Sequence, residues 1–497
     1  MSVARRRRLS WAALAAIGVL AVWAGCSAPD ADRASIASTQ PEVVHRGPVV
    51  LVTFANLRAD LVASTDEDGS AWTPTLDALY DGLSGAQSWR GVSASSSPVP
   101  ALASLVFGVD PWHHGVLSHA DGDRRRALPS LGSALAVEGY STVGYLPRRA
   151  GFQRYGVVDG FDAVHDLGDG SAARAELAEL DGSARFVWIH VPVANPPLLD
   201  HRQLVSRLAK RPAVAPIDSA DLLPYADPER SLPDELAAAA WELYRQEAAW
   251  GDQLLDSLLE SIAASGRADE TLLVVTALHG CEFGEHGQAL FAQNLGRESI
   301  EVPLVVRLPP TFSRRLAEHG PWVSTPRIWS TLVEAVGGEP APIHLPSLFH
   351  RSTLPVFSSL FAQGSRHRFS VLEDDGDGAA LQLRWSTQFA DDEPEYYALQ
   401  AAEAQSRRRD HRPSRLMRAR LARALDLQPP LSGIGTPVTP ELTLERWPIV
   451  GGFEALADRE AEQRLATTLR DRFLRFVDRE RSRRTEDARR RIETPKE

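Results

Sequence analysis

The sequence is poor in cysteine: Cys26 and Cys281 are the only two among 497 residues. A framework of several disulfide bonds, which stabilises many small exported proteins, is therefore excluded. Basic residues are in the minority, with 54 Lys and Arg against 65 Asp and Glu and a net charge of −11. Since an acidic protein repels phosphate backbones, no nucleic-acid partner is expected. The chain is long enough to be stabilised by a hydrophobic core instead.

The apolar run near the N-terminus, at 11–24, is shorter than the ~20 residues that cross a bilayer comfortably. Four arginines at 5–8 precede it, and Gly25 and Cys26 follow it. This order is typical of an export signal at 1–25, and its end resembles the bacterial lipoprotein box, in which the cysteine is lipidated. An uncleaved anchor helix is the alternative, because Trp23 is unusual in that box. The Ser-, Ala- and Pro-rich residues 26–47 are then expected to form a flexible tether.

Apolar, β-branched runs alternate with amphipathic segments along residues 48–310. Strands are expected at 49–53, 141–146, 186–190, 272–276 and 302–308, and helices at 73–83, 128–138 and 236–264. This alternation predicts an α/β domain with a doubly wound, mostly parallel sheet flanked by helices. Ligands of such sheets bind at the carboxyl ends of the strands, so functional side chains are expected there.

The pattern weakens after residue 310. A helix at 328–336 and a strand pair around a turn at 374–378 predict a smaller C-terminal α+β subdomain over 311–462. The last residues, 463–497, are highly charged and predict a terminal helix or tail.

Several segments resemble motifs of the sulfatase family, within the alkaline-phosphatase superfamily, in the family's order. They are 49–60 (VVLVTFANLRAD), 98–115 (PVPALASLVFGVDPWHHG), 138–140 with 160–162, 190–197, 276–287 (TALHGCEFGEHG) and 302–307. The resemblance spans residues 48–346 and implies the sulfatase fold. It also implies a reaction in which a divalent cation, usually calcium, is held by carboxylates. A formylglycine, Ser or Thr attacks the ester, and Arg, Lys and His residues neutralise the transferred group.

This chain departs from the family at nearly every catalytic position. The metal carboxylate positions match Ala55, with Asn56 beside it, and Leu278, while the nucleophile position matches Pro98. The other catalytic positions match Ala101, Leu102, Pro147, Arg149, Asn195 and Phe291. The resemblance therefore implies an inactive member that needs no cofactor, with a neutral, partly apolar cleft in place of the active site.

The retained polar residues of the motifs are His190, His279, Glu282, Glu285 and His286. We interpret them as scaffold residues with the two glutamates facing outward; the alternative is that His279 and His286 hold a soft metal. Cys281 is expected to be a buried small hydrophobe rather than a zinc ligand.

A shifted alignment would make Ser96 or Ser97 the nucleophile, but it restores neither metal position. The sequence thus predicts a sulfatase-like lipoprotein of the bacterial cell envelope, anchored to the membrane by its N-terminal lipid and facing the periplasm or exterior. Its role would be to bind or scaffold an envelope protein or a glycan. The alternative is an active sulfate- or phosphate-ester hydrolase with a relocated nucleophile or metal site, and only this alternative requires a divalent cation.

Overall fold

The computed structural model describes residues 44–388 with gaps at 67, 118–127, 148–154, 227–229, 288, 353–355, 362–365 and 375–378. It also describes 441–448, 454–455, 461, 464–465 and 468. The predicted export signal and the lipidation residue Cys26 lie outside these residues, as do most of the tether and of the terminal tail. In the part of the chain that is described, no helix is long and apolar enough to span a bilayer.

The main sheet has eight strands in the order β10-β2-β9-β6-β1-β5-β3-β4. They are β1 (Val49–Asn56), β2 (Gln87–Val92), β3 (Ser141–Leu146), β4 (Ala163–Asp166), β5 (Arg185–Val191), β6 (Leu272–His279), β9 (Glu301–Arg307) and β10 (Trp322–Ser324). Neighbouring strands are parallel, except that β9 runs antiparallel to both β6 and β2. The predicted α/β fold with a mostly parallel sheet is confirmed.

Strand β1 lies at the centre of this sheet, and all eight of its residues are buried. Val50, Val52 and Phe54 contribute to one apolar cluster, while Val49 and Leu51 contribute to a second one. Successive side chains of a strand point to opposite faces, so each cluster is the core on one face of the sheet. A strand that is covered on both faces accounts for the uninterrupted apolar run in the sequence.

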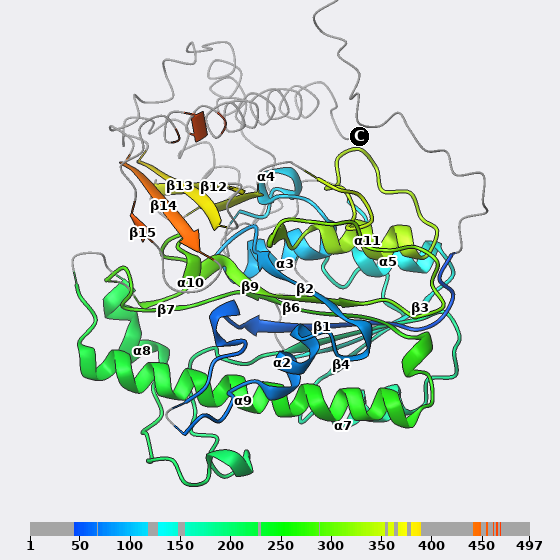
Figure 1. Cartoon of the computed structure of the whole chain (residues 1–497), viewed down its shortest axis with the longest axis horizontal. Coiled ribbons are helices and arrows are strands. Elements are labelled where there is room, and N and C mark those ends of the chain that lie inside the picture. Colours follow the sequence, from blue (N-terminus) through cyan, green and yellow to red (C-terminus); the bar gives the residue numbers. More distant parts are fainter. Residues whose placement is uncertain are drawn as a thin grey trace, which may run out of the picture. The chain divides into compact units, whose positions relative to one another are not determined.

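Helices cover both faces (Figure 1). On one face lie α2 (Pro74–Tyr80), α7 (Ser171–Ala178) and the 31-residue α9 (Asp234–Ala264). On the other lie α3 (Pro98–Phe107), α5 (Leu131–Val137) and α11 (Arg327–Ala335). Two short helices, α4 (Pro111–His114) and α8 (Ser219–Leu222), lie in connecting segments.

The smaller antiparallel sheet has the order β11-β12-β13-β14-β15. Its strands are β11 (Val356–Phe361), β12 (Arg366–Asp374), β13 (Ala379–Gln388), β14 (Glu441–Pro448) and β15 (Glu454–Ala455). The predicted strand pair around 374–378 is confirmed by β12 and β13, although the turn itself lies outside the described residues. Ser358 Oγ donates to Ser93 O at 2.6 Å and Gln382 Nε2 donates to Leu295 O at 2.7 Å, which joins this sheet to loops at the edge of the main one.

Candidate functional site

The residues at the two predicted metal positions lie side by side at the carboxyl ends of β1 and β6. These strands are parallel neighbours, and Asn56 is paired in register with His279. The same register places Ala55 beside Leu278. Parallel strands end at one edge of a sheet, so residues more than two hundred positions apart in the sequence meet there.

These residues are covered rather than exposed. Ala55 is 5% exposed, Leu278 is 4% exposed, and Asn56 and His279 are 0% exposed. A neutral, partly apolar cleft was expected here; Ala55 and Leu278 are apolar, and all four side chains are buried.

The nucleophile position begins helix α3, which lies against this edge. Pro98 is the first residue of the helix, where a missing N–H costs nothing because that group has no partner inside the helix. Ala101 and Leu102, from the next turn, belong to the same apolar cluster as Leu278.

The segment that carries Phe291 packs against the residues at the carboxyl ends of β1 and β6. The Ala292 N–H donates to Ser96 O at 3.0 Å. The Phe291 ring lies 4.9 Å from the His279 ring, centroid to centroid. Phe291 therefore contacts the one imidazole that remains from the predicted metal positions.

The His190 segment supports the edge from the β5 side. His190 Nδ1 lies 2.9 Å from Thr53 Oγ1, which also accepts from Trp188 Nε1 at 2.9 Å. Asn56 Nδ2 donates to Ala194 O at 2.8 Å, so the half-buried Asn195 follows a residue bound directly to β1. Pro147 follows β3, which β5 separates from β1, and Arg149 lies outside the described residues.

Solved structures share this architecture. A putative sulfatase from Bacteroides thetaiotaomicron has a TM-score of 0.53 at 14% identity, covering 72% of this chain and 91% of its own. A 2-O GAG sulfatase has a TM-score of 0.52 at 15% identity, covering 72% and 90%. A protein bound to its substrate, D-glucosamine-2-N,6-O-disulfate, has a TM-score of 0.51 at 13% identity, covering 77% and 99%. This chain has the sulfatase fold.

No protein-family model matches the sequence, and no curated protein matches it either. At such low identities the likeness establishes the fold alone. Whether this sulfatase fold retains the family's chemistry must be argued from its residues.

The residues at the family's cation position do not fit a hard cation. Ala55 and Leu278 offer no ligand atom, which leaves the Asn56 amide and the His279 imidazole. The first is oriented by its bond to Ala194 O, and His279 Nδ1 lies 2.8 Å from Gly280 O. Calcium takes six to eight oxygen ligands, typically including carboxylates. We therefore derive no step through a cation at this position.

The residues near the nucleophile position do not form an activated nucleophile. Ser96 is 0% exposed, and its hydroxyl has no hydrogen-bond partner among the described residues. A nucleophilic serine requires a base within hydrogen-bond reach. Ser97 precedes α3, is 5% exposed, and makes no side-chain capping bond to it.

A buried Ser–His pair, which the sequence did not reveal, lies further along α3. Ser104 Oγ lies 2.9 Å from His114 Nε2, and the Val116 N–H donates to His114 Nδ1 at 3.0 Å. Because Nδ1 accepts, Nε2 carries the proton and donates to the serine. This imidazole cannot be the base for Ser104, so the pair joins α3 to α4.

Helix α9 holds the Asn195 segment in place through buried polar contacts. Glu247 accepts from the Ala194 N–H at 3.3 Å and the Leu199 N–H at 3.1 Å, and it contacts His201 Nε2 at 2.9 Å. The His201 ring stacks on Trp250 at 5.3 Å. The backbone around Asn195 is therefore fixed from the helix side.

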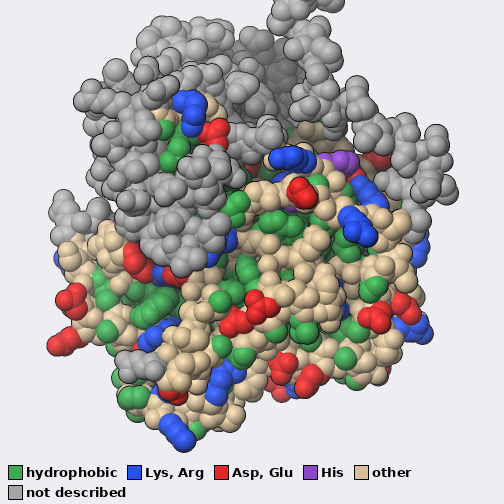
Figure 2. All heavy atoms as spheres, in the orientation of Figure 1, with side chains coloured by type: hydrophobic (Ala, Val, Ile, Leu, Met, Phe, Trp, Pro, Cys, Tyr) green, Lys and Arg blue, Asp and Glu red, His purple; other side chains and the backbone are tan. Residues whose placement is uncertain are grey.

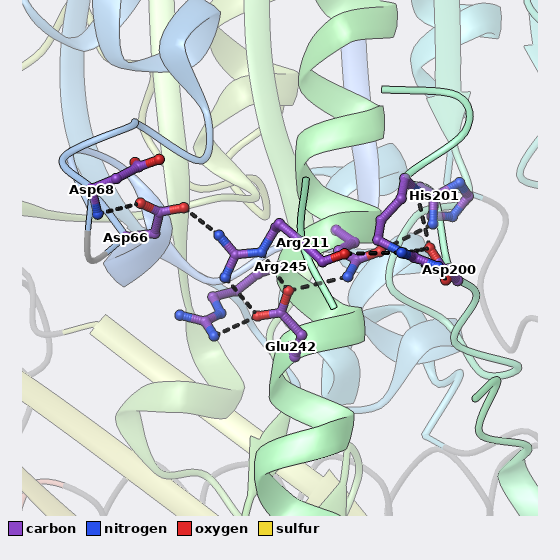
Figure 3. A network of polar contacts seen from close by, with 9 residues as sticks. Asp66, Asp68, Asp200, His201, Arg211, Glu242 and Arg245 are labelled. Atoms are coloured by element: carbon purple, nitrogen blue, oxygen red, sulfur yellow. Dashed lines mark hydrogen bonds and ion pairs between the residues drawn. The ribbon is translucent and has the colours of Figure 1, made fainter. Parts of the chain in front are cut away.

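A second polar network on α9 holds Arg211, in the chain that follows the Asn195 segment (Figure 3). Arg211 donates from Nε to Glu242 at 2.7 Å and from a terminal nitrogen to Asp66, and Glu242 also accepts from Arg245 at 2.7 Å. The guanidinium of Arg211 lies 4.3 Å from the centre of the Trp72 ring. We interpret this network as structural, because its charges are paired with one another.

The loop after His279 corrects one expectation from the sequence. Glu282 does not face outward: it is 0% exposed, in the short strand β7 (Glu282–Phe283) that pairs with β8 (Ala289–Leu290). Glu285 is exposed and forms an ion pair with Arg58 at 2.5 Å. Burial raises the pKa of the Cys281 thiol to about 12, so it stays protonated, which agrees with its expected role as a small hydrophobe.

The buried Glu282 lies beside His286 and Glu298. Glu298 belongs to α10 (Arg297–Ile300), outside every motif singled out in the sequence, and burial raises its pKa. Glu282, His286 and Glu298 thus form a cluster of titratable groups that the motifs alone did not indicate.

Proposed function

We propose that this protein is a non-catalytic member of the sulfatase fold that binds or scaffolds a partner in the bacterial cell envelope. The observation that carries the proposal is the pair Ala55 and Leu278, buried at 5% and 4% exposure where the family holds its cation. Two hydrocarbon side chains packed together cannot bind a cation or polarise an ester.

The loss of the nucleophile has a similar effect by itself. Removing a nucleophile from a hydrolase costs on the order of 10⁶ in kcat, and Pro98 has no nucleophilic atom. The replacements Ala55, Leu102 and Leu278 are also mutually consistent, because a charged residue kept at one of these buried positions without its partners would be costly.

The envelope location rests on the N-terminal sequence, in which four arginines, a short apolar run and Cys26 form the pattern of a lipoprotein signal. The protein would then be held at the membrane by its lipid. Its partner would be an envelope protein or a glycan. On the face in Figure 2, the basic side chains are interspersed with acidic ones.

A second function is an active sulfate- or phosphate-ester hydrolase whose cation or nucleophile has moved. The cluster of Glu282, His286 and Glu298 favours it, since this cluster could hold an ion elsewhere in the same loop. This second function also requires an activated nucleophile, however, and the Ser96 hydroxyl contacts no base within the described residues.

Hydrolysis assays separate the two functions. The full-length protein, solubilised in detergent, is incubated with aryl sulfate, aryl phosphate and a phosphonate monoester, with and without added divalent cations. The Ser96→Ala variant serves as a matched control. We expect no turnover above the buffer rate in either protein. Cation-dependent turnover in the wild type that is lost in Ser96→Ala would support the hydrolase instead.

A further inference from the structure

Glu282, His286 and Glu298 bring three ligand atoms together, all within 4.8 Å of one another. His286 Nδ1 lies 2.5 Å from Glu282 Oε1 and 3.6 Å from Glu298 Oε2. Glu282 is 0% exposed and Glu298 is 8% exposed. Two buried carboxylates thus converge on one imidazole nitrogen.

The cluster is held in place from outside. Asn294 Nδ2 donates to the second oxygen of Glu282, while Asn294 Oδ1 accepts the Gly296 N–H at 2.6 Å. The amide of Asn294 is therefore fixed with its donor toward the carboxylate. Partners of this kind, which orient a ligand without touching the ion, are typical of metal sites.

Two glycines allow the elements to approach this closely. A Cβ on Gly296 would lie 2.6 Å from His286 Cε1. A Cβ on Gly280 would lie 1.9 Å from Glu298 O, which is closer than any side chain permits. The close packing of both segments fixes the His286 ring and the start of α10 relative to the loop.

The charges in this cluster are not balanced by its own residues. Arg58, the guanidinium that contacts the same loop, forms its ion pairs with Asp60 and Glu285 at 2.5 Å each. Glu298 Oε2 accepts no hydrogen bond among the described residues, and its ionic contact is the one with His286. A buried carboxylate oxygen without a hydrogen bond is costly, and a cation bound to it would remove that cost.

We propose that Glu282, His286 and Glu298 bind a divalent transition-metal ion, Zn²⁺ in particular, with water at the remaining position. One imidazole and two carboxylates are ligands that Zn²⁺ accepts in proteins, at about 2.0–2.2 Å. The ion lies between the β7–β8 hairpin and α10 and stabilises their contact. It is a different site from the family's cation position.

This proposal revises the expectation that the protein holds no cofactor. From the sequence, Glu282 was expected to face outward, and Glu298 lay outside the motifs. The fold buries Glu282 and brings Glu298 next to it. The proposal is also independent of whether the protein hydrolyses esters.

The test is a zinc titration of the full-length protein after treatment with a chelator, using a chromophoric zinc chelator as competitor. We expect one Zn²⁺ per chain and a higher melting temperature with zinc. Glu298→Gln keeps the size of the side chain and removes its charge, and it should weaken binding by at least about 10-fold to 100-fold. The control is Glu285→Gln in the same loop, which should leave zinc affinity unchanged.

X-ray absorption at the zinc edge of the wild type tests the ligands without any variant. We expect a first shell of nitrogen and oxygen with a single imidazole. Failure of the folded wild type to bind zinc would overturn the proposal, and so would a sulfur ligand or more than one imidazole. Equal affinity in the wild type and a folded Glu298→Gln would overturn it as well.

Discussion

Leu278 lies near the carboxyl end of the central strand β6, at a position where the sulfatase motif has a carboxylate, and it belongs with Ala101 and Leu102 to one apolar cluster. Its neighbour Ala55 is buried too. At the scale of the residue, the position that the motif resemblance matches to a metal carboxylate is therefore part of the hydrophobic core in this chain.

Leu278→Asp returns the family's carboxylate to this position. We expect the free energy of unfolding to fall by about 3–5 kcal/mol, because the charge is buried without a partner. Leu278→Met, which conserves volume, should cost less than about 1.5 kcal/mol. Urea denaturation of both variants measures the difference. A stable Leu278→Asp variant that gains a bound cation would show that the site is intact and only masked.

Glu334 on α11 provides a pH-dependent contribution to stability. Burial opposes ionisation, but hydrogen bonds from His350, Arg314 and Ser347 outweigh it and lower the pKa of Glu334 from 4.5 to about 2. A carboxyl whose pKa is lowered by folding stabilises the fold above pH 4.5, and this contribution is lost as the pH falls through about 2.

The variant Glu334→Gln should therefore lose about 1–2 kcal/mol of unfolding free energy at neutral pH. A shift of one pKa unit corresponds to ~1.4 kcal/mol, so the full shift of Glu334 would give a larger loss. The expected loss is smaller because His350, one of the partners of Glu334, is largely exposed and solvent screens this contact. The difference from the wild type should shrink as the pH falls from 4.5 toward 2. Chemical denaturation across that range measures it, and a difference that does not vary with pH would contradict the assignment.

At the scale of elements, α9 positions the loop that leads away from the Asn195 segment. Glu242 bridges Arg211 and Arg245, with side chains that are only 15% to 24% exposed. Glu242→Gln should lower the free energy of local opening of residues 200–211 by about 1–2 kcal/mol, because the two guanidinium groups lose their common partner. Hydrogen exchange measures the opening.

The control for this prediction is Glu270→Gln. Its ion pair with Arg267 is exposed at 39% and 47%, and such pairs contribute little. Exchange in the 200–211 loop should not change in this variant. Equal effects from the two substitutions would mean that the network in Figure 3 does not hold the loop.

The sequence predicted best the elements that are buried on both sides. Strands β1 and β6 came from continuous apolar runs rich in β-branched residues, and α9 came from a long helical period. Strand β2 was missed, because its half-exposed QSWRGV has no such run. The sequence pattern also could not predict that β9 runs antiparallel to β6. A strand buried on both faces is apolar whichever way it runs.

The candidate site was predictable to the extent that its residues follow strands. The resemblance to sulfatase motifs placed Ala55 near Leu278, because adjacent parallel strands end at one edge. Glu298 was not predictable, because it joins Glu282 and His286 only through the path of the chain from β8 to α10. The burial of Glu282 depends on that same path.

At the scale of the whole molecule, the account predicts attachment to a membrane through Cys26. Cys26→Ser removes the thiol that would carry the lipid. We expect the variant to move from the membrane fraction to the soluble fraction, which immunoblotting of fractionated cells measures. A Cys26→Ser protein that stays in the membrane would mean that residues 11–24 form an uncleaved anchor.

We propose that this sulfatase fold does not hydrolyse esters, and a single-turnover experiment can decide this. Full-length protein in large excess over an aryl sulfate, or over an aryl phosphate, is followed for a day at neutral pH, so that even one event per molecule is detected. We predict release of the aryl group at the buffer rate, since Pro98 offers no nucleophile and Ala55 and Leu278 offer no cation ligand. Release that increases with protein concentration, and that follows the protein through two different chromatographic steps, would contradict the account.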